Sequence, residues 1–507
     1  MNSALSFHVR SIPSGVIARV PTPYQDANDR IVTSEALGAF VCRDEIDHLS
    51  VIPTRVIPNT TLIIRLNFPV GWIPTERFVA QAPMGEKLTG AVARETIYPG
   101  TAVAPVMTAT KDKTLLLGCL DQRTCTLRSK ETYLEIELTP KVGEVIRIAD
   151  RTGTDCSTLL AGFRSSWTAL VGSPSDPVCG SVMQRASCLL AIQLQDLEGD
   201  SAAVERTVRK LVGEHEGLAA AVYFWGQMSD YVGPAPPWNP GTGCCLPLME
   251  LRPRYQTWLP ALARELADKG IYVGYYSNPS YTLPIQQWTA YNVIANDASA
   301  HYIDAIASCT PQQIAATKVL PLDHPLIEWP TLAMPGYAVM ASGALWHGPT
   351  FPDGTPHTTS ADPRITSWPE MGRLLFPAVK MFTGPQDGEW TSESAEPPHI
   401  FVYPGNRWAW RLGMGLMLQP QQARWGVNEC VNEMLALWHV HQWFAREPFY
   451  RGVVKHSEPG LFITRFTDRT GKELYVFDQW ETPIARTVMV NGNNISIPPS
   501  RLGISTL

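Results

Sequence analysis

Apolar and polar positions alternate in a strand–helix–strand pattern that begins near residue 187. The segment SCLLAIQLQ reads as a buried strand, and SAAVERTVRKLVGEHEG after it reads as an amphipathic helix with Ser201 as its N-cap. The segment GLAAAVYFWG then reads as a second strand, which ends at Trp225. Alternation of this kind predicts a parallel sheet, because a helix must carry the chain back before the next parallel strand begins.

The same pattern continues towards the C-terminus. LARELADKG reads as another helix, and later apolar runs end in aromatic or acidic residues. The third strand is expected to end at Tyr275 and Tyr276, the fourth at Asp304, the fifth near Glu328 and the sixth at Trp346 and His347. Two further segments, RLLFPAVKMFTG and WAWRLGMGLMLQP, are expected to complete the sheet without a definite strand assignment. At this length a (β/α)8 TIM-like barrel is the favoured closure of an α/β chain.

The two ends of the chain have a different pattern. Short runs of alternating or β-branched residues, separated by Pro, Gly and Asn, fill the first 160 residues and the last 57. VNGNN near the C-terminus supplies an Asn-Gly hairpin turn. We therefore expect three domains: a β-sandwich-like domain at 1–160, a TIM-like barrel at 161–450 and a small C-terminal β domain at 451–507.

Composition narrows the class of protein. The chain has 507 residues, is 45% hydrophobic and only 17% charged, which is typical of a well-packed globular protein. A formal charge of −6 argues against a nucleic-acid partner, which would require a basic face. The sixteen Trp and sixteen Tyr are many, and several fall in loops, where aromatic rings can hold sugars as well as pack a core.

Targeting and cysteine patterns add little. The first residues lack the pattern of a signal peptide, and no apolar run approaches the ~20 residues that cross a bilayer. We expect a soluble protein without a membrane partner, cytoplasmic as the sequence stands or secreted if a signal has been cropped. The ten Cys show no zinc-ligand spacing. Cys119 and Cys125 could form a disulfide in an oxidising compartment, but reduced buried thiols are the favoured interpretation.

Several segments together resemble a family of TIM-barrel proteins of unknown function, grouped with the glycoside hydrolases of the α-galactosidase-like type. In the family's order they are IYPGTAVAPVMTATKDKTLLLGCLD, VYFWGQMSDYVGPAPPW, ADKGIYVGYYSNP, HYIDAIASC and LYVFDQWETPIARTVMVNG. The resemblance extends roughly from Tyr98 to Ile497 and implies a barrel enzyme that acts on carbohydrates. The sixth strand departs from the pattern, because it ends without the carboxylate expected of a close α-galactosidase relative.

Glycosidases cleave their bond between two carboxyl groups, one of which protonates the leaving oxygen while the other attacks or activates water. Asp304, at the expected end of the fourth strand, is the candidate nucleophile or base, unless it only caps a turn or pairs with an arginine. Glu328 is the candidate acid, and Trp329 beside it could raise its pKa by desolvation. A role in hydrogen bonding the substrate is the alternative for Glu328. Asp323 is its main rival.

Aromatic and polar residues near the expected strand ends would form the sugar-binding surface. If they converge on one face, they make an aromatic-walled cup, although aromatic rings also fill barrel ends simply as packing. The candidate substrate-binding residues are Trp225, Tyr275, Tyr276, Asn278, Trp346 and His347.

The sequence thus predicts a hydrolase of O-glycosidic bonds in an oligo- or polysaccharide, using carboxylates alone and needing no metal or organic cofactor. Two alternatives stay open: a non-catalytic carbohydrate-binding barrel that has lost one acid, and a structural protein in which Asp304 is merely a cap.

Overall fold

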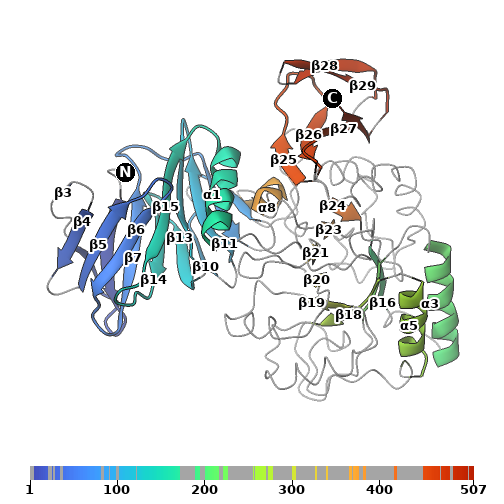
Figure 1. Ribbon diagram of the computed structural model, residues 1–507, viewed down its shortest axis with the longest axis horizontal. Coiled ribbons are helices and arrows are strands. Elements are labelled where there is room, and N and C mark those ends of the chain that lie inside the picture. The colour runs from blue at the N-terminus through green and yellow to red at the C-terminus, as the bar shows by residue number, and fades with distance from the viewer. Residues whose placement is uncertain are drawn as a thin grey trace. The chain divides into compact units, whose positions relative to one another are not determined.

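The computed structural model describes most of residues 5–171, most of residues 449–506, and separate strands and helices between them (Figure 1). The residues it describes are 5–20, 25–26, 29–34, 38–81, 85–90, 92–98, 102–121, 123–171, 189–193, 200–215, 221–225, 255, 257–269, 272–277, 300–303, 326–327, 338–340, 365–367, 369–375, 381–383, 416–418, 449–468, 470–479, 483–490, 492–500 and 502–506. The chain divides into two compact units: unit 1 is Met1–Pro174, Thr331–Ala333 and Asp362–Leu375, and unit 2 is Ser175–Pro330, Met334–Ala361 and Phe376–Leu507.

Unit 1 contains two antiparallel sheets. The six-stranded sheet has the spatial order β10 (Arg94–Tyr98), β13 (Cys125–Ser129), β14 (Tyr133–Leu138), β7 (Thr60–Asn67), β1 (Leu5–Ser11) and β2 (Ile17–Val20). The ten-stranded sheet has the order β22 (Ile365–Ser367), β9 (Glu86–Thr89), β8 (Glu76–Gln81), β11 (Ala102–Thr110), β12 (Thr114–Cys119), β15 (Ile146–Gly153), β6 (Leu49–Arg55), β5 (Gly38–Asp44), β4 (Asp29–Ser34) and β3 (Gln25–Asp26).

The core of unit 1 follows from the alternation of side chains along its strands. Phe7, Ile64, Ile136 and Leu127 are register neighbours across four strands of the six-stranded sheet, and all four are buried. Side chains at such positions lie on one face, so the strands present a continuous apolar surface. Strands β11 and β12 of the other sheet contact β13 and β14, which means that the two sheets cover each other's apolar faces.

Helix α1 (Cys156–Val171) follows β15 and covers part of the ten-stranded sheet. Asp155 caps its N-terminus, since its Oδ2 accepts the backbone N–H of Thr158 at 3.0 Å. Leu160, Phe163 and Trp167 recur at helical spacing and are buried. The segment that leads out of the N-terminal domain is therefore held by an apolar stripe.

The middle of unit 2 is a parallel sheet of eight strands that are ordered in space as in the sequence (Figure 1). Its strands are β16 (Leu189–Gln193), β17 (Ala221–Trp225), β18 (Tyr272–Ser277), β19 (Ala300–Ile303), β20 (Leu326–Ile327), β21 (Ala338–Met340), β23 (Met381–Thr383) and β24 (Leu416–Leu418). Each neighbouring pair is parallel. The expected strands lie in the expected segments, and β23 and β24 come from the two segments that the sequence left without definite strands.

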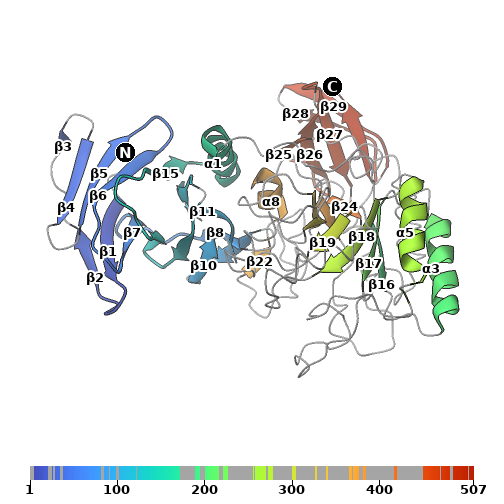
Figure 2. The same cartoon turned by 60° about the horizontal axis from the view of Figure 1, so that its bottom comes forward.

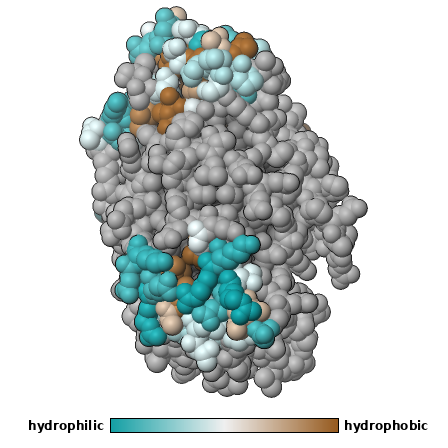
Figure 3. All heavy atoms as spheres, turned by 90° about the vertical axis from the view of Figure 1, so that its right-hand side faces the viewer, coloured by the Kyte–Doolittle hydropathy of each residue, from teal (hydrophilic) through white to brown (hydrophobic). Residues whose placement is uncertain are grey.

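Two helices of unit 2 alternate with these strands in the part of the chain that the structure describes: α3 (Ser201–His215) after β16 and α5 (Leu259–Asp268) after β17. The prediction that Ser201 is the N-cap is wrong by one residue. Asp200 is the cap, because its Oδ1 accepts the N–H of Ala203 at 2.6 Å, and the Ser201 Oγ instead accepts the indole N–H of Trp258. The face of α3 and α5 that is turned towards solvent is mostly hydrophilic (Figure 3).

The C-terminal part of unit 2 has two small antiparallel sheets. One is four-stranded, with the order β25 (Phe449–Val453), β26 (Phe462–Thr467), β27 (Glu473–Asp478) and β30 (Leu502–Thr506), and the other is the hairpin of β28 (Arg486–Val490) and β29 (Asn493–Ile497).

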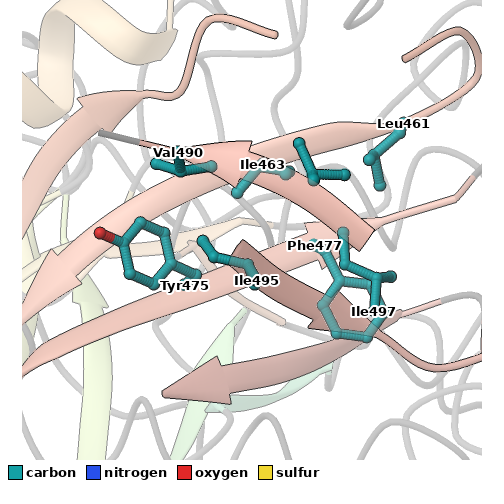
Figure 4. Close-up of a cluster of buried hydrophobic side chains, with 8 residues drawn as sticks. Leu461, Ile463, Tyr475, Phe477, Val490, Ile495 and Ile497 are labelled. Atoms are coloured by element: carbon teal, nitrogen blue, oxygen red, sulfur yellow. The ribbon is translucent and has the colours of Figure 1, made fainter. Parts of the chain in front are cut away.

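The hairpin packs its apolar face on the four-stranded sheet. Val488, Val490 and Ile495 of the hairpin join Ile463 and Phe477 in one buried cluster (Figure 4). Val490 pairs with Asn493, which leaves two residues in the connection, and Gly492 has a φ of 82°. The two-residue connection and the positive φ of Gly492 confirm the expected hairpin turn, because the two-residue turns that match the twist of β-hairpins contain residues at positive φ.

No helix among the described residues is long and apolar enough to cross a membrane.

Candidate functional site

The candidate site is the edge at which the strands of the parallel sheet end. In parallel sheets, ligands bind beyond the carboxyl ends of the strands, because the connections that follow them gather at that edge. Three of the substrate-binding candidates fall on described strands: Trp225 is the last residue of β17, and Tyr275 and Tyr276 lie in β18. The other candidates lie outside the described residues: Asn278, Asp304, Asp323, Glu328, Trp346 and His347.

The described backbone leads directly to three of these positions. Ser277 pairs with Ile303, and Ile303 pairs with Ile327, in one row across β18, β19 and β20. These three residues are also the last described residues of their strands. In the sequence, the residues that follow them are Asn278, Asp304 and Glu328.

The register separates the two tyrosines of β18. Consecutive positions of a strand lie on opposite faces of its sheet, so Tyr275 and Tyr276 belong to different faces. Phe224 pairs with Tyr275, and Trp225 therefore shares the face of Tyr276. Only one of the two tyrosine positions can belong to a cup that contains the Trp225 position.

Register partners identify two positions that the sequence interpretation missed. Gln193 of β16 pairs with Trp225, and Tyr302 of β19 pairs with Tyr276. All four positions share one face of the sheet. Side chains two residues apart in a strand lie on the same face. Because Asp304 is a candidate site residue, Tyr302, two residues before it, could have been predicted from the sequence.

A second set of carboxylates lies on the six-stranded sheet of unit 1, where Glu135 and Glu137 of β14 are both buried. Arg65 donates to Glu135 at 2.6 Å, Arg128 donates to Glu135 at 2.7 Å and to Glu137 at 2.5 Å, and Arg10 pairs with Glu137 at 2.9 Å. These carboxylates are neutralised by paired arginines. The network is suited to joining strands rather than to exchanging protons with a ligand.

Burial keeps Cys119, Cys125 and Cys156 of unit 1 in the protonated thiol form. Cys119, Cys125 and Cys156 are buried free thiols, so Cys119 and Cys125 do not form a disulfide with each other. Burial raises the pKa of Cys119 and of Cys156 to about 12. Thiols held in the neutral form are poor nucleophiles and poor metal ligands. Over the described ranges, no group of three or more His, Cys, Asp or Glu residues could hold a metal ion.

No protein-family model matches the sequence, and no curated protein is similar to it in sequence.

Solved structures of similar fold are glycoside hydrolases. An α-N-acetylgalactosaminidase from Bifidobacterium bifidum, NagBb, has a TM-score of 0.57 and is 11% identical, over 94% of this chain and 93% of that one. A GH31 family sulfoquinovosidase from E. rectale has a TM-score of 0.50 and is 10% identical, over 87% of this chain and 78% of that one. The chain therefore has a glycoside-hydrolase-like fold with a small C-terminal sheet domain.

Proposed function

We propose that the protein is a glycosidase that hydrolyses O-glycosidic bonds of an oligo- or polysaccharide with two carboxyl groups. The observation that carries this proposal is the register of β19 and β20. These neighbouring parallel strands run side by side through Ile303 and Ile327, and the sequence continues both with an acid, Asp304 and Glu328. The two-carboxylate mechanism requires two acids close together, and adjacent strand ends can supply them.

The strand order supports a barrel around this site. Eight parallel strands follow one another in space as in the sequence, which is the order of a (β/α)8 barrel. We propose that β24 closes the sheet against β16. The unit 1 sheets would then be the expected β-sandwich, and the parallel sheet would be a TIM-like barrel of the α-galactosidase-like type. The glycoside-hydrolase-like fold of the chain supports this proposal.

The proposed roles follow from the strand positions. Asp304 serves as nucleophile or base, and Glu328 serves as the acid that protonates the leaving oxygen. Asp323 comes three residues before β20 begins at Leu326, on the side of the amino end of that strand. Because barrel chemistry takes place at the carboxyl ends, Glu328 is favoured over Asp323 as the acid.

Strand spacing also indicates the stereochemistry of the reaction. Neighbouring strands lie about 4.8 Å apart. If Asp304 and Glu328 continue the row of Ile303 and Ile327, their spacing would suit the carboxyl separation of about 5–5.5 Å of retaining enzymes better than the roughly 6.5–9.5 Å of inverting ones. We propose net retention at the anomeric carbon, with Asp304 as the nucleophile.

The sugar would bind on the face that carries Gln193, Trp225, Tyr276 and Tyr302. Aromatic rings can stack on the apolar face of a pyranose, and Asn278, Trp346 and His347 are proposed to complete the surface around it. No metal or organic cofactor takes part in the proposed reaction.

A non-catalytic carbohydrate-binding protein is the second candidate, and one observation favours it. The sixth strand, β21, ends at Met340 instead of leading into an acid. A barrel with the aromatic face but with a single competent acid would bind glycans without turning them over.

Matched carboxamide variants test the proposal. Asp304→Asn and Glu328→Gln are each expected to lower kcat by at least about 10²-fold, since a carboxamide neither attacks the anomeric carbon nor donates the proton. Asp323→Asn is the matched control and is expected to leave kcat within about twofold. The measurement is the release of aryl alcohol from a panel of aryl glycosides, together with NMR of the first-formed anomer on the substrate that responds.

The outcomes separate the candidates. Unchanged turnover in both the Asp304 and Glu328 variants rejects the site. A wild-type protein that binds glycans in a titration but releases no aryl alcohol from any glycoside supports the binding protein, and loss of turnover in Asp323→Asn reverses the choice of acid.

A further inference from the structure

The connection between the sixth and seventh strands of the parallel sheet contains structure that belongs to the other unit. Strands β21 and β23 are neighbours, with Val339 paired to Met381 and Met340 paired to Phe382. Between them the chain forms β22 and then helix α8 (Pro369–Leu375), and Asp362–Leu375 belong to unit 1. We call these residues, 362–375, the strap.

The first part of the strap extends a sheet of unit 1. Strand β22 is antiparallel to β9, with Ile365 opposite Leu88 and Ser367 opposite Glu86, and it forms one edge of the ten-stranded sheet (Figure 2). Without β22, the hydrogen-bonding groups of β9 would form that edge themselves. An uncovered edge strand is unfavourable, because it offers unpaired N–H and C=O groups to other chains.

The second part of the strap adds an apolar contact. Helix α8 packs on α1, and its Met371, Leu374 and Leu375 are buried, with 0%, 7% and 0% of their surface exposed. A seven-residue helix is too short to be stable by itself. Its stability therefore comes from the surface of unit 1, which its apolar side covers.

The strap also divides the connection near its C-terminal end. It leaves residues 376–380 between the end of α8 and the start of β23, so little chain separates the anchored helix from the seventh strand. A connection tied down near its end has fewer arrangements than one of the full length 341–380, and its ordering costs less conformational entropy.

We propose that the strap is a positioning segment for the glycosidase site: it uses unit 1 to hold strand β23, the neighbour of β21 in the parallel sheet. The inference rests on the proposed function for its kinetic part. Unit 1 would thus be an integral part of the enzyme rather than a detachable module. Met371 and Leu375 act through the residues they hold and touch no substrate.

The test uses full-length variants. Met371→Asp places a charge in the buried contact of α8 and is expected to release the strap, whereas Met371→Leu conserves volume and is expected to keep it. Hydrogen exchange is measured for peptides that contain β9, β21 and β23, and kcat and KM are measured on the aryl glycoside that the wild type turns over. A released strap is expected to raise exchange in all three strands and to change kcat/KM by about tenfold or more.

A matched control distinguishes positioning from general destabilisation. Ile495→Asp places the same charge in the buried cluster of the C-terminal sheets and is expected to raise exchange in β28 and β29 without affecting β21, β23 or kcat/KM. If Met371→Asp does not fold, the milder Met371→Ala and the strand-breaking Thr366→Pro replace it.

The proposal is overturned if β9 gains exchange while β21, β23 and kcat/KM keep wild-type values, because the strap would then serve unit 1 alone. It is also overturned if the Ile495→Asp control changes β21 and β23 equally. A wild-type protein that turns over no glycoside rejects the proposed function instead, and the exchange of β21 and β23 still decides whether the strap holds them.

Discussion

Burial controls the protonation of His8 on the six-stranded sheet. Its side chain is 8% exposed, and the Ser6 hydroxyl lies 3.0 Å from its Nε2. The side-chain amide of Asn67 donates to the same hydroxyl. The Ser6 hydroxyl can therefore donate its own hydrogen to Nε2 of a neutral His8. Desolvation, followed by the charges of Arg65 and Arg19, lowers the pKa of His8 to about 4, and the charge of Glu135 opposes this only in part.

The lowered pKa of His8 predicts acid sensitivity of unit 1. The unfolded chain, with a His pKa of about 6.5, binds the proton more readily than the folded chain, so the stabilisation by neutral His8 is complete above pH ~6.5. It is lost as the pH falls from ~6.5 to ~4, at a cost on the order of 3 kcal/mol, and the loss levels off at lower pH. Urea unfolding at several pH values checks this. His8→Gln should remove that part of the slope, and an unchanged slope would contradict the assignment.

Close packing makes glycine necessary at position 118 in β12. A Cβ built at Gly118 would lie 2.5 Å from a ring carbon of Phe163 on α1 and 3.2 Å from the carbonyl oxygen of Pro105. Phe163 is fully buried, and its ring has little room to move. The absent side chain thus allows the helix to approach the sheet closely.

Gly118→Ala is therefore expected to lower the free energy of unfolding by about 1–3 kcal/mol through overpacking. Gly213→Ala in α3 is the matched control, since nothing lies within 4 Å of its added Cβ. There the change is expected to stabilise by up to about 1 kcal/mol, because alanine favours helix. Chemical denaturation of both variants gives the comparison, and equal effects would argue against the close approach.

At the scale of elements, alternation along strands decides which residues can act together. The sequence interpretation grouped Tyr275 with Tyr276 because both end an apolar run. The register assigns the Tyr276 position to the face of Trp225 and Tyr302, and the Tyr275 position to the face of Phe224 and Ile303. A one-residue difference in a strand exchanges a position between the two faces of the sheet.

The two tyrosines of β18 should consequently differ in effect. Tyr276→Ala is expected to weaken glycan binding by at least about tenfold, the loss of one stacking or hydrogen-bonding contact. Tyr275→Ala is expected to leave the affinity of the folded protein within about twofold and to act on stability instead, because its position alternates to the other face. Calorimetric titration with a bound oligosaccharide, beside thermal unfolding, distinguishes them. The opposite order of affinities would reverse the face that we assign to the site.

The N-cap of helix α3 is another feature that the sequence alone does not decide. Asp200 and Ser201 are both good capping residues, and a sequence that presents them in succession does not choose between them. The choice depends on the position of Trp258, which precedes α5 and donates its indole N–H to Ser201. Contacts from another part of the chain thus fix the first residue of α3.

At the scale of the whole molecule, each of the two units consists of several separate segments of the chain, whereas each expected domain is one continuous segment. A division at residues 160 and 450 treats each domain as one continuous segment, whereas unit 1 also includes Asp362–Leu375. The sequence of the strap has no distinguishing pattern, because β22 has three residues and α8 has seven. The boundaries of the three expected domains stay a prediction. A truncation at residue 160 would separate the strap from the rest of unit 1.

The sequence by itself determined where the strands from β16 to β21 lie along the chain, since short apolar runs such as LLAIQ and YVGYYS, rich in β-branched or aromatic residues, favour strands. It also determined the hairpin turn at Gly492, a local property of Asn-Gly. The tertiary structure decided the pairing of three-residue strands such as β23 and β24, the faces of consecutive residues and the course of the strap. These depend on register and on contacts between distant segments, which are too weak locally to leave a pattern in the sequence.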